Sequence, residues 1–281
     1  MAENKTIIYN ASTLSEVLYH LKNIPNLKVL AGGTLCKKNN TETNFELPQN
    51  CIFINNIPEL KEITKKERYI DLGSAITLNQ ILEIGKNKIP QFLYDAIESV
   101  GTYTIRNIAN IGGNICYSPQ KMNLYAPLLA LEASVELQSY SETKQIPFSR
   151  FTDIPQGFLL TKIRIPLQDW YTSNYVKLGS NTHIDKYSAS YTFLTESAKG
   201  TILEDLRIAF AGTIFFRSKE LENSLIGARL PLSEKDGIIM LYKATTLFDE
   251  AIASTAGKSN DLQRAQFLSL LEKSIQELKD I

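Results

Sequence analysis

Two glycine pairs about eighty residues apart restrict the possible folds of this chain more than any other feature. The first pair lies in Val29-Leu30-Ala31-Gly32-Gly33-Thr34, and the second lies in Asn110-Ile111-Gly112-Gly113-Asn114. Each pair follows an apolar, strand-forming approach and precedes a small polar residue. Because glycine has no Cβ and adopts positive φ at little cost, such a pair lets backbone amides approach an anion closely. Two such loops from distant segments predict that one diphosphate is held from both sides, which indicates a dinucleotide cofactor.

The two loops have separate expected roles at this diphosphate. In the first loop, we expect contacts from the amides of Gly32 and Gly33 and from the hydroxyl of Thr34, supported by the strand end 29–31. In the second loop, residues 112–114 are expected to complete the contact. A glycine pair taken alone is most often an ordinary turn, so the prediction depends on both pairs occurring in one chain.

The composition is that of an ordinary globular protein. The 281 residues are 43% hydrophobic and 21% charged, and the length is enough for two domains or one large one. Basic and acidic residues both number 30, so no charge surplus points to nucleic acid or to an anionic membrane. We recognise neither a signal peptide nor an apolar run of the roughly 20 residues that a spanning helix needs. The scattered Cys36, Cys51 and Cys116 suit reduced thiols, so we expect a cytoplasmic protein.

Hydrophobic periodicity predicts mixed helices and strands before residue 170. Helices are expected over 10–24, where Thr13 and Glu16 suggest a capping box, between Thr77 and Gly85, and over 91–100. Strands are expected at 28–31, 51–54, 69–72, 133–139 and 160–165. The sequence contains no G-x-G-x-x-G, so it lacks the defining motif of a Rossmann fold.

The character of the sequence changes near residues 170–173, where we place a domain boundary. Beyond it we expect a polar loop at 178–186, a strand at 206–213, and helices at about 217–226, 234–254 and 261–280. The last helix is expected to turn one face to the core, formed by Leu262, Ala265, Leu268 and Leu271. Together these elements indicate an α+β fold.

Further fragments accompany the glycine pairs in a fixed order. The second pair ends the run TIRNIANIGGNI at 104–115, and Ser118-Pro119 follows it. The other fragments are LGSAITL at 72–78, PLLALEA at 127–133, IRIP at 163–166, and Glu222 with LIG at 225–227. In order and spacing along the whole chain, these fragments resemble the flavin-binding subunits of the xanthine dehydrogenase and carbon monoxide dehydrogenase group, which are molybdenum hydroxylases.

The resemblance implies an α+β protein with a p-cresol methylhydroxylase-type FAD-binding domain. This domain would span residues 1–172 as two α/β lobes, and a smaller α+β C-terminal domain would span residues 173–281. The resemblance also implies one FAD, which we expect to be non-covalent, and adds these residues to its site: Val100, Asn110, Ile111, Leu160 and Lys177. A cation such as Lys177 near the isoalloxazine ring would stabilise the anionic reduced form, whereas the alternative is a solvated surface lysine.

Other polar residues have weaker assignments. Arg106, inside the second motif, either faces a phosphate or pairs with a carboxylate, and the sequence leaves both open. His20 is expected to pack on the surface of a helix, and His183 lies in a loop that, by resemblance, runs near the flavin. We find no nucleophile set, paired carboxylates or metal-ligand cluster, so we assign no catalytic residue and no metal to this chain. Its chemistry would belong to a cofactor.

The sequence departs from the family pattern after Ser118-Pro119. The family usually carries an aspartate there that would hold the flavin's adenosine ribose, but Met122 occupies that position and no carboxylate lies nearby. We hypothesise that Asn123 takes over this role as an uncharged donor or acceptor. Leu35 also replaces an aspartate that is common after the first glycine pair.

The resemblance implies the FAD-binding electron-transfer subunit of a multi-subunit molybdenum hydroxylase. Substrate, most plausibly a purine such as xanthine, would be oxidised at a molybdenum cofactor in a second chain. Electrons would cross two iron–sulfur centres in a third chain, reach FAD here and leave to NAD⁺ or another acceptor. Two alternatives remain: a free-standing flavin reductase, such as the UDP-N-acetylenolpyruvylglucosamine reductases, and a non-catalytic assembly subunit that has lost FAD.

Overall fold

The chain forms two compact units, each assembled from segments that are separated in the sequence. The structure is a computed structural model that describes residues 6–34, 47–117, 123–180, 185, 187–254 and 261–280. The first unit contains residues 1–85, 102–118 and 132–167, and the second contains residues 86–101, 119–131 and 168–281. The expected domain division after residue 172 stays a prediction.

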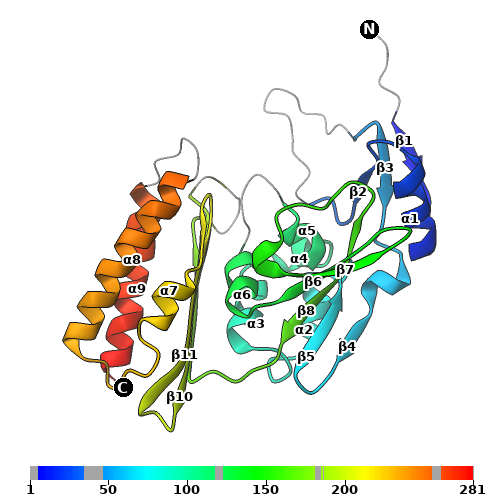
Figure 1. Cartoon of the computed structure of the whole chain (residues 1–281). Coiled ribbons are helices and arrows are strands. Elements are labelled where there is room, and N and C mark those ends of the chain that lie inside the picture. Colours follow the sequence, from blue (N-terminus) through cyan, green and yellow to red (C-terminus); the bar gives the residue numbers. More distant parts are fainter. Residues whose placement is uncertain are drawn as a thin grey trace. The chain divides into compact units, whose positions relative to one another are not determined.

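A three-stranded parallel sheet begins the first unit (Figure 1). Its strands lie in the order β1 (Ile7–Tyr9), β3 (Asn50–Phe53) and β2 (Lys28–Leu30). Helix α1 (Leu14–Asn23) connects β1 to β2 and buries Val17 and Leu18 against Ile52 and its neighbours. Thr13 caps this helix by accepting a hydrogen bond from the Glu16 amide, as the sequence predicts.

A five-stranded antiparallel sheet supplies the other strands of the first unit. Its strands lie in the order β4 (Ile63–Lys65), β5 (Tyr69–Gly73), β8 (Leu159–Pro166), β6 (Ser134–Gln138) and β7 (Thr143–Pro147). Three short helices belong to the same unit: α2 (Leu78–Glu83), α4 (Tyr103–Arg106) and α5 (Ile111–Ile115). Two short 3₁₀ helices, η1 (Pro58–Lys61) and η2 (Phe148–Arg150), complete it. Thr77 and Gln80 form the predicted capping box of α2.

The second unit is built on a four-stranded antiparallel sheet. Its strands lie in the order β12 (Phe215–Phe216), β11 (Ile202–Ala211), β10 (Ala189–Ala198) and β9 (Thr172–Leu178). One face of the sheet carries α7 (Lys219–Asn223), α8 (Glu234–Ser254) and α9 (Asp261–Lys279), whereas α3 (Gln91–Glu98) and α6 (Tyr125–Ala130) lie on the other (Figure 1). Segments on both sides of the second glycine motif in sequence therefore belong to this unit.

An aromatic core joins α8 and α9 to the sheet. Phe248 and Phe267 stack with ring centroids 4.4 Å apart, and Phe210 meets both rings edge-on. This packing confirms part of the predicted core face of the last helix, since Leu271 is buried and Leu268 packs against the core, and corrects the rest. Leu262 is 47% exposed and Ala265 is exposed, whereas the buried residues are Gln263, Phe267, Leu271, Ser274, Ile275 and Leu278.

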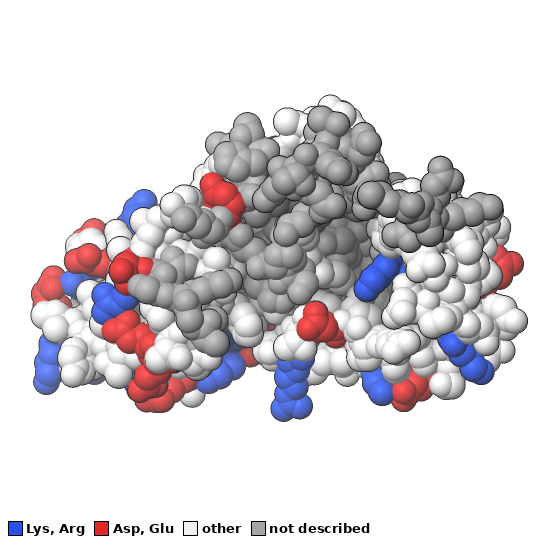
Figure 2. Space-filling view, turned by 90° about the horizontal axis from the view of Figure 1, so that it is seen from above, with Lys and Arg blue, Asp and Glu red and all other residues white. Residues whose placement is uncertain are grey.

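The mixture of helices and strands confirms the α+β prediction. The expected strands before residue 170 correspond to β2, β3, β5, β6 and β8, but β9 and β10 were not predicted. Within the described residues, no helix is long and apolar enough to cross a membrane, and no three metal-ligating side chains cluster. Figure 2 shows basic and acidic side chains interspersed on the viewed face, without a large area of one sign.

Candidate cofactor site

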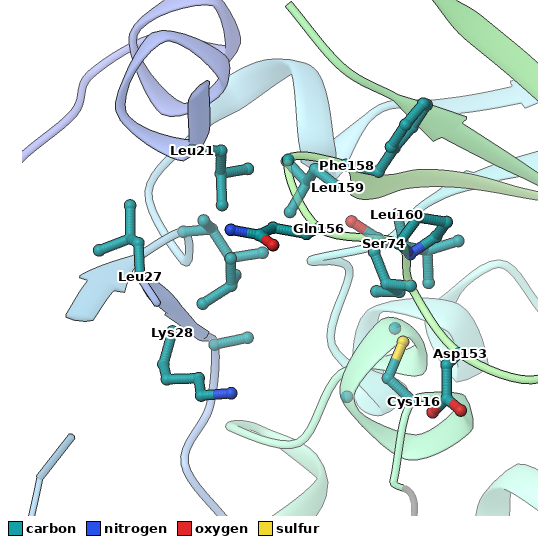
Figure 3. A pocket seen from close by; sticks show the side chains of 18 of the residues that line it. Leu21, Leu27, Lys28, Ser74, Cys116, Asp153, Gln156, Phe158, Leu159 and Leu160 are labelled. Carbon is teal, nitrogen blue, oxygen red and sulfur yellow. The ribbon is translucent and has the colours of Figure 1, made fainter. Parts of the chain in front are cut away.

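A cavity of about 550 Å³ lies within the first unit (Figure 3). The end of β2, helix α5 and the loop that leads into β8 form its walls. Its volume is in the range of small-molecule and cofactor sites. Predicted site residues from three distant segments line it: Val29, Ala31, Asn110, Gly112, Gly113 and Leu160. The structure therefore brings Ala31 of the first motif, three residues of the second motif and the predicted β8 residue to one cavity. The other predicted residues of these segments are not among the lining residues: Leu30, Gly32, Gly33, Thr34, Ile111 and Asn114.

The first glycine motif, residues 31–34, directly follows β2 and contacts the segment before the second motif. A Cβ on Gly32 would lie 2.0 Å from the carbonyl oxygen of Ile108, so this close approach requires glycine. Gly33 has a φ of 67°, which glycine adopts at little cost. Among the described residues, the amides of this motif have no hydrogen-bond partner. The motif therefore presents open donors of the kind that bind a diphosphate.

The second glycine motif, residues 110–114, forms the start of helix α5 and has a different role. The Gly113 amide donates to the Asn110 side chain at 2.6 Å, and the Gly112 amide donates to the carbonyl oxygen of Ser74 at 2.9 Å. The Asn114 amide donates to the backbone of Asn110 at 3.1 Å. Each of these amides therefore already has a protein partner, and the expected contact of residues 112–114 with a diphosphate stays a prediction. Glycine is needed here since a Cβ on Gly112 would lie 2.6 Å from Ser74 O.

Ser74 supplies an open donor that the sequence did not predict. The residue follows β5, lines the cavity and is 2% exposed, yet its hydroxyl has no partner among the described residues. An unsatisfied buried polar group costs about 1–3 kcal/mol. A ligand with strong acceptors, such as a diphosphate, would satisfy this hydroxyl. The side-chain oxygen of Asn114, beside Gly113, is unpaired in the same way.

Only two charged side chains, Lys28 and Asp153, are among the described residues that line the cavity. In Figure 3 Lys28 lies on the left of the view and Asp153 on the right. Neither charged group has a hydrogen bond or ion pair with another described residue. Apolar side chains, including Leu21, Leu27 and Phe158, form much of the remaining wall. The cavity thus combines open donors, one cation, one carboxylate and apolar surface.

Other predicted residues meet in the second unit. Lys177 of β9 donates from Nζ to the carbonyl oxygen of Ser99 at 2.8 Å. Ser99 directly precedes Val100, another predicted site residue. Burial lowers the pKa of Lys177, so its charged form is less favoured than in water. The Ser99 hydroxyl also shares a hydrogen bond of 3.1 Å with the hydroxyl of Tyr175, whose pKa burial raises. Lys177 is therefore a partly buried cation with a defined position.

The structure also places the remaining polar candidates. Asn123 is buried in the second unit just before α6. The Arg106 Nε donates to the side-chain oxygen of Asn79 at 3.2 Å, and the choice between a phosphate and a carboxylate as its further partner stays open. His20 packs against the ring of Tyr9 at 5.5 Å, in agreement with the packing role. The predictions for Leu35, Cys36, Ser118-Pro119, Met122 and His183 lie outside the described residues.

Sequence reasoning missed the loop before β8 and the end of α1. Phe151–Leu159 and residues from Leu21 to Lys28 line the cavity, but no sequence motif marks them. Two local signals were available. Lys28 directly precedes Val29 of the first motif, and Pro155 with Gly157 indicates a turn just before Leu160.

Comparison with known proteins identifies relatives among flavoprotein subunits. The chain is 28% identical over 232 residues to the glyceraldehyde dehydrogenase medium chain of Sulfolobus acidocaldarius, covering 78% of this chain and 80% of the relative. It is 31% identical over 148 residues to the xanthine dehydrogenase FAD-binding subunit of Escherichia coli O157:H7, covering 51% and 49%. It is 27% identical over 281 residues to the indole-3-acetaldehyde oxidase of Arabidopsis thaliana, covering 90% of this chain but only 20% of that protein.

Solved structures share the fold over nearly the whole chain. Carbon monoxide dehydrogenase from Hydrogenophaga pseudoflava matches with a TM-score of 0.78 at 19% identity, covering 98% of this chain and 96% of the matched chain. Reconstituted carbon monoxide dehydrogenase from Oligotropha carboxidovorans matches with a TM-score of 0.78 at 18% identity, covering 100% and 99%. The expected fold class is therefore confirmed.

Fold and cavity together define a dinucleotide-binding α+β protein. The family model described as the FAD binding domain in molybdopterin dehydrogenase matches residues 3–168, which is more than half of the chain. The chain belongs to this family, so its cofactor is FAD and it is a component of an oxidoreductase. The cavity, which residues of both glycine motifs line, lies within the matched residues.

Proposed function

We propose that this chain is the FAD-binding electron-transfer subunit of a multi-subunit molybdenum hydroxylase of the xanthine dehydrogenase type. The observation that carries the proposal is the coincidence of the family match with a cavity containing open donors. The amide of Ala31 and the buried Ser74 hydroxyl line the cavity, and the amides of residues 32–34 directly follow; all of them lack protein partners among the described residues. Diphosphate oxygens would accept from these groups, and Lys28 would balance their charge.

The residues of the chain would bind and orient the cofactor. FAD supplies electron transfer when it is bound. The first motif and Ser74 would hold the diphosphate. The apolar wall around Leu21 and Phe158 would exclude water from a ring system of the cofactor. Lys177, partly buried and held by Ser99, is proposed to lie near the isoalloxazine and favour negative charge there. The site residues of both units remain proposals.

Partner chains would carry the other redox centres. The relatives named as a medium chain and as an FAD-binding subunit support a multi-subunit assembly. The three cysteines of this sequence are fewer than the four ligands of a common iron–sulfur cluster. We therefore propose an iron–sulfur subunit as electron donor, a molybdenum-cofactor subunit as the place of substrate oxidation, and NAD⁺ or another molecule as acceptor. Free Cys51 and Cys116 fit the reducing cytoplasm proposed as its location.

The substrate class of the assembly is proposed as a purine, with an aldehyde as the second candidate. The aldehyde is retained because the Sulfolobus relative is named as a glyceraldehyde dehydrogenase. Either molecule would be oxidised on another chain, so this subunit would not determine whether the complex oxidises a purine or an aldehyde.

Native purification of the tagged full chain tests the proposal. We expect larger chains that contain molybdenum and iron to co-purify, and xanthine or glyceraldehyde to bleach the flavin absorbance of this complex. The isolated chain should turn over neither donor. Purine oxidation by the isolated chain, or recovery of a lone flavoprotein with no larger partner, would contradict the proposal. The second outcome would favour a free-standing reductase.

A further inference from the structure

Asp153 is a loop residue with no evident role in the fold. It lies in the loop between η2 and β8, and its carboxylate is solvent-exposed while lining the cavity. Phe151, which is 2% exposed, anchors the loop on one side. On the other side, the Phe158 amide closes a turn by donating to Pro155 O at 3.0 Å. No hydrogen bond or ion pair joins Asp153 to another described residue.

An unpaired carboxylate close to a diphosphate is unfavourable unless the carboxylate accepts hydrogen bonds from the ligand. Two negative groups in one cavity repel each other, and Lys28 is the only cation among the described lining residues. A carboxylate accepts strong hydrogen bonds from hydroxyl groups, which removes this disadvantage. FAD carries hydroxyls on the adenosine ribose and on the ribityl chain, so the cofactor offers suitable donors on either side of its diphosphate.

The sequence around Ser118-Pro119 makes the position of Asp153 informative. The stretch 118–124 contains no carboxylate, although the resemblance places a ribose-binding aspartate there. Among the described residues, Asp153 is the only carboxylate that lines the cavity, which residues of both glycine motifs also line. This chain therefore presents a carboxylate to the cavity from a different loop.

We propose that Asp153 accepts hydrogen bonds from sugar hydroxyls of FAD and thereby replaces the carboxylate missing after Ser118-Pro119. The inference rests on the proposed binding of FAD in this cavity. Asp153 is a positioning residue: it fixes the sugar and takes no part in electron transfer. Its negative charge, opposite Lys28 in Figure 3, would also orient the cofactor along the cavity.

Equilibrium binding to the flavin-free full chain tests this inference. Flavin fluorescence measures FAD and FMN, and calorimetry measures ADP, for the wild type, Asp153→Asn and Asp153→Glu. We expect Asp153→Asn to weaken FAD about tenfold, because a charge-assisted hydrogen bond becomes a neutral one, and Asp153→Glu to recover part of the loss. Glu67→Gln is the matched control, since Glu67 is an exposed carboxylate of the same unit that does not line the cavity.

The three ligands separate the two sources of hydroxyls. Loss of ADP affinity with unchanged FMN affinity assigns Asp153 to the adenosine ribose, and the reverse assigns it to the ribityl chain. FAD affinity in Asp153→Asn equal to that of the wild type and of Glu67→Gln would overturn the inference while leaving FAD binding intact. A wild-type chain that binds no FAD would instead refute the proposed function. Asp153→Ala provides the same comparison if Asp153→Asn does not purify.

Discussion

Replacing Gly32 by alanine should break the contact between the two glycine-bearing segments. The added Cβ would lie 2.0 Å from Ile108 O, whereas real Cβ atoms essentially never come closer than 3.0 Å. The first motif and the Ile108 segment would therefore have to separate by about 1 Å. Overpacking of this kind costs about 1–3 kcal/mol, and here the obstructing atom is backbone that cannot rotate away. We expect a loss near 2 kcal/mol.

Gly113→Ala is the matched control within the same site. Its Cβ would lie 3.0 Å from the Asn110 side-chain oxygen, which can move, and alanine favours the helical conformation of α5 over glycine by about 1 kcal/mol. This gain approximately offsets a weakened Asn110 cap, so we expect a change within about 1 kcal/mol.

Thermal unfolding and FAD titration of both variants measure the difference. A loss of about 2 kcal/mol corresponds to a melting temperature about 4–8 °C lower, and the displaced amides of residues 31–34 should also weaken FAD. Equal melting temperatures and equal FAD affinities for Gly32→Ala and the wild type would refute the reasoning. A larger loss in Gly113→Ala than in Gly32→Ala would show that the wrong glycine was assigned the tight contact.

Three further predictions concern the cofactor and its surroundings. Acid precipitation should release all flavin into the supernatant, and yellow colour that stays in the pellet would contradict non-covalent binding. Asn123 and Asp153 are competing candidates for the ribose contact. If Asn123 makes it, Asn123→Ala should raise the FAD dissociation constant about fivefold, since a neutral hydrogen bond contributes about 1 kcal/mol; an unchanged constant removes Asn123 from the site and is the result expected if Asp153 makes the contact. Because burial lowers the pKa of Lys177, the unfolded chain holds this proton more tightly. The free energy of unfolding of the wild type should therefore increase with pH between the lowered pKa of Lys177 and its ordinary value of 10.5. Chemical denaturation of Lys177→Met at several pH values should lack this part of the increase.

The local structure that follows from short-range chemistry was predictable from the sequence. Thr13 and Thr77 cap the expected helices, because a hydroxyl at the N-cap position accepts a hydrogen bond from a nearby backbone amide whatever the tertiary fold. The strand before the first motif was also correctly located, since Lys28–Leu30 is followed by residues that end a strand. Both glycine pairs then proved to be places where backbones approach closely.

The function of each glycine was less predictable, because it depends on partners from distant segments. Nothing in the sequence indicates that the carbonyl oxygen of Ser74 accepts a hydrogen bond from the Gly112 amide, or that the backbone of Ile108 occupies the space beside Gly32. The same limit explains the last helix. Leu262 is exposed and Phe267 is buried, and Phe267 packs against aromatic rings from distant segments, such as Phe210 and Phe248.

The second unit was harder to predict than the first. Residues 86–101 and 119–131 belong to it although they flank the second glycine motif, which belongs to the first unit. The two compact units therefore alternate along the chain, and the expected domain division after residue 172 stays a prediction. The contact between Lys177 and Ser99 arises from it, because β9 and α3 come from segments about eighty residues apart.

The visible absorption spectrum of the purified full chain, with quantification of the extracted cofactor, tests the central claim most directly. The account predicts two flavin bands and one FAD per chain, either as purified or after titration with FAD. A colourless chain that remains colourless and binds no FAD would contradict the account, and would favour an assembly subunit that has lost its cofactor.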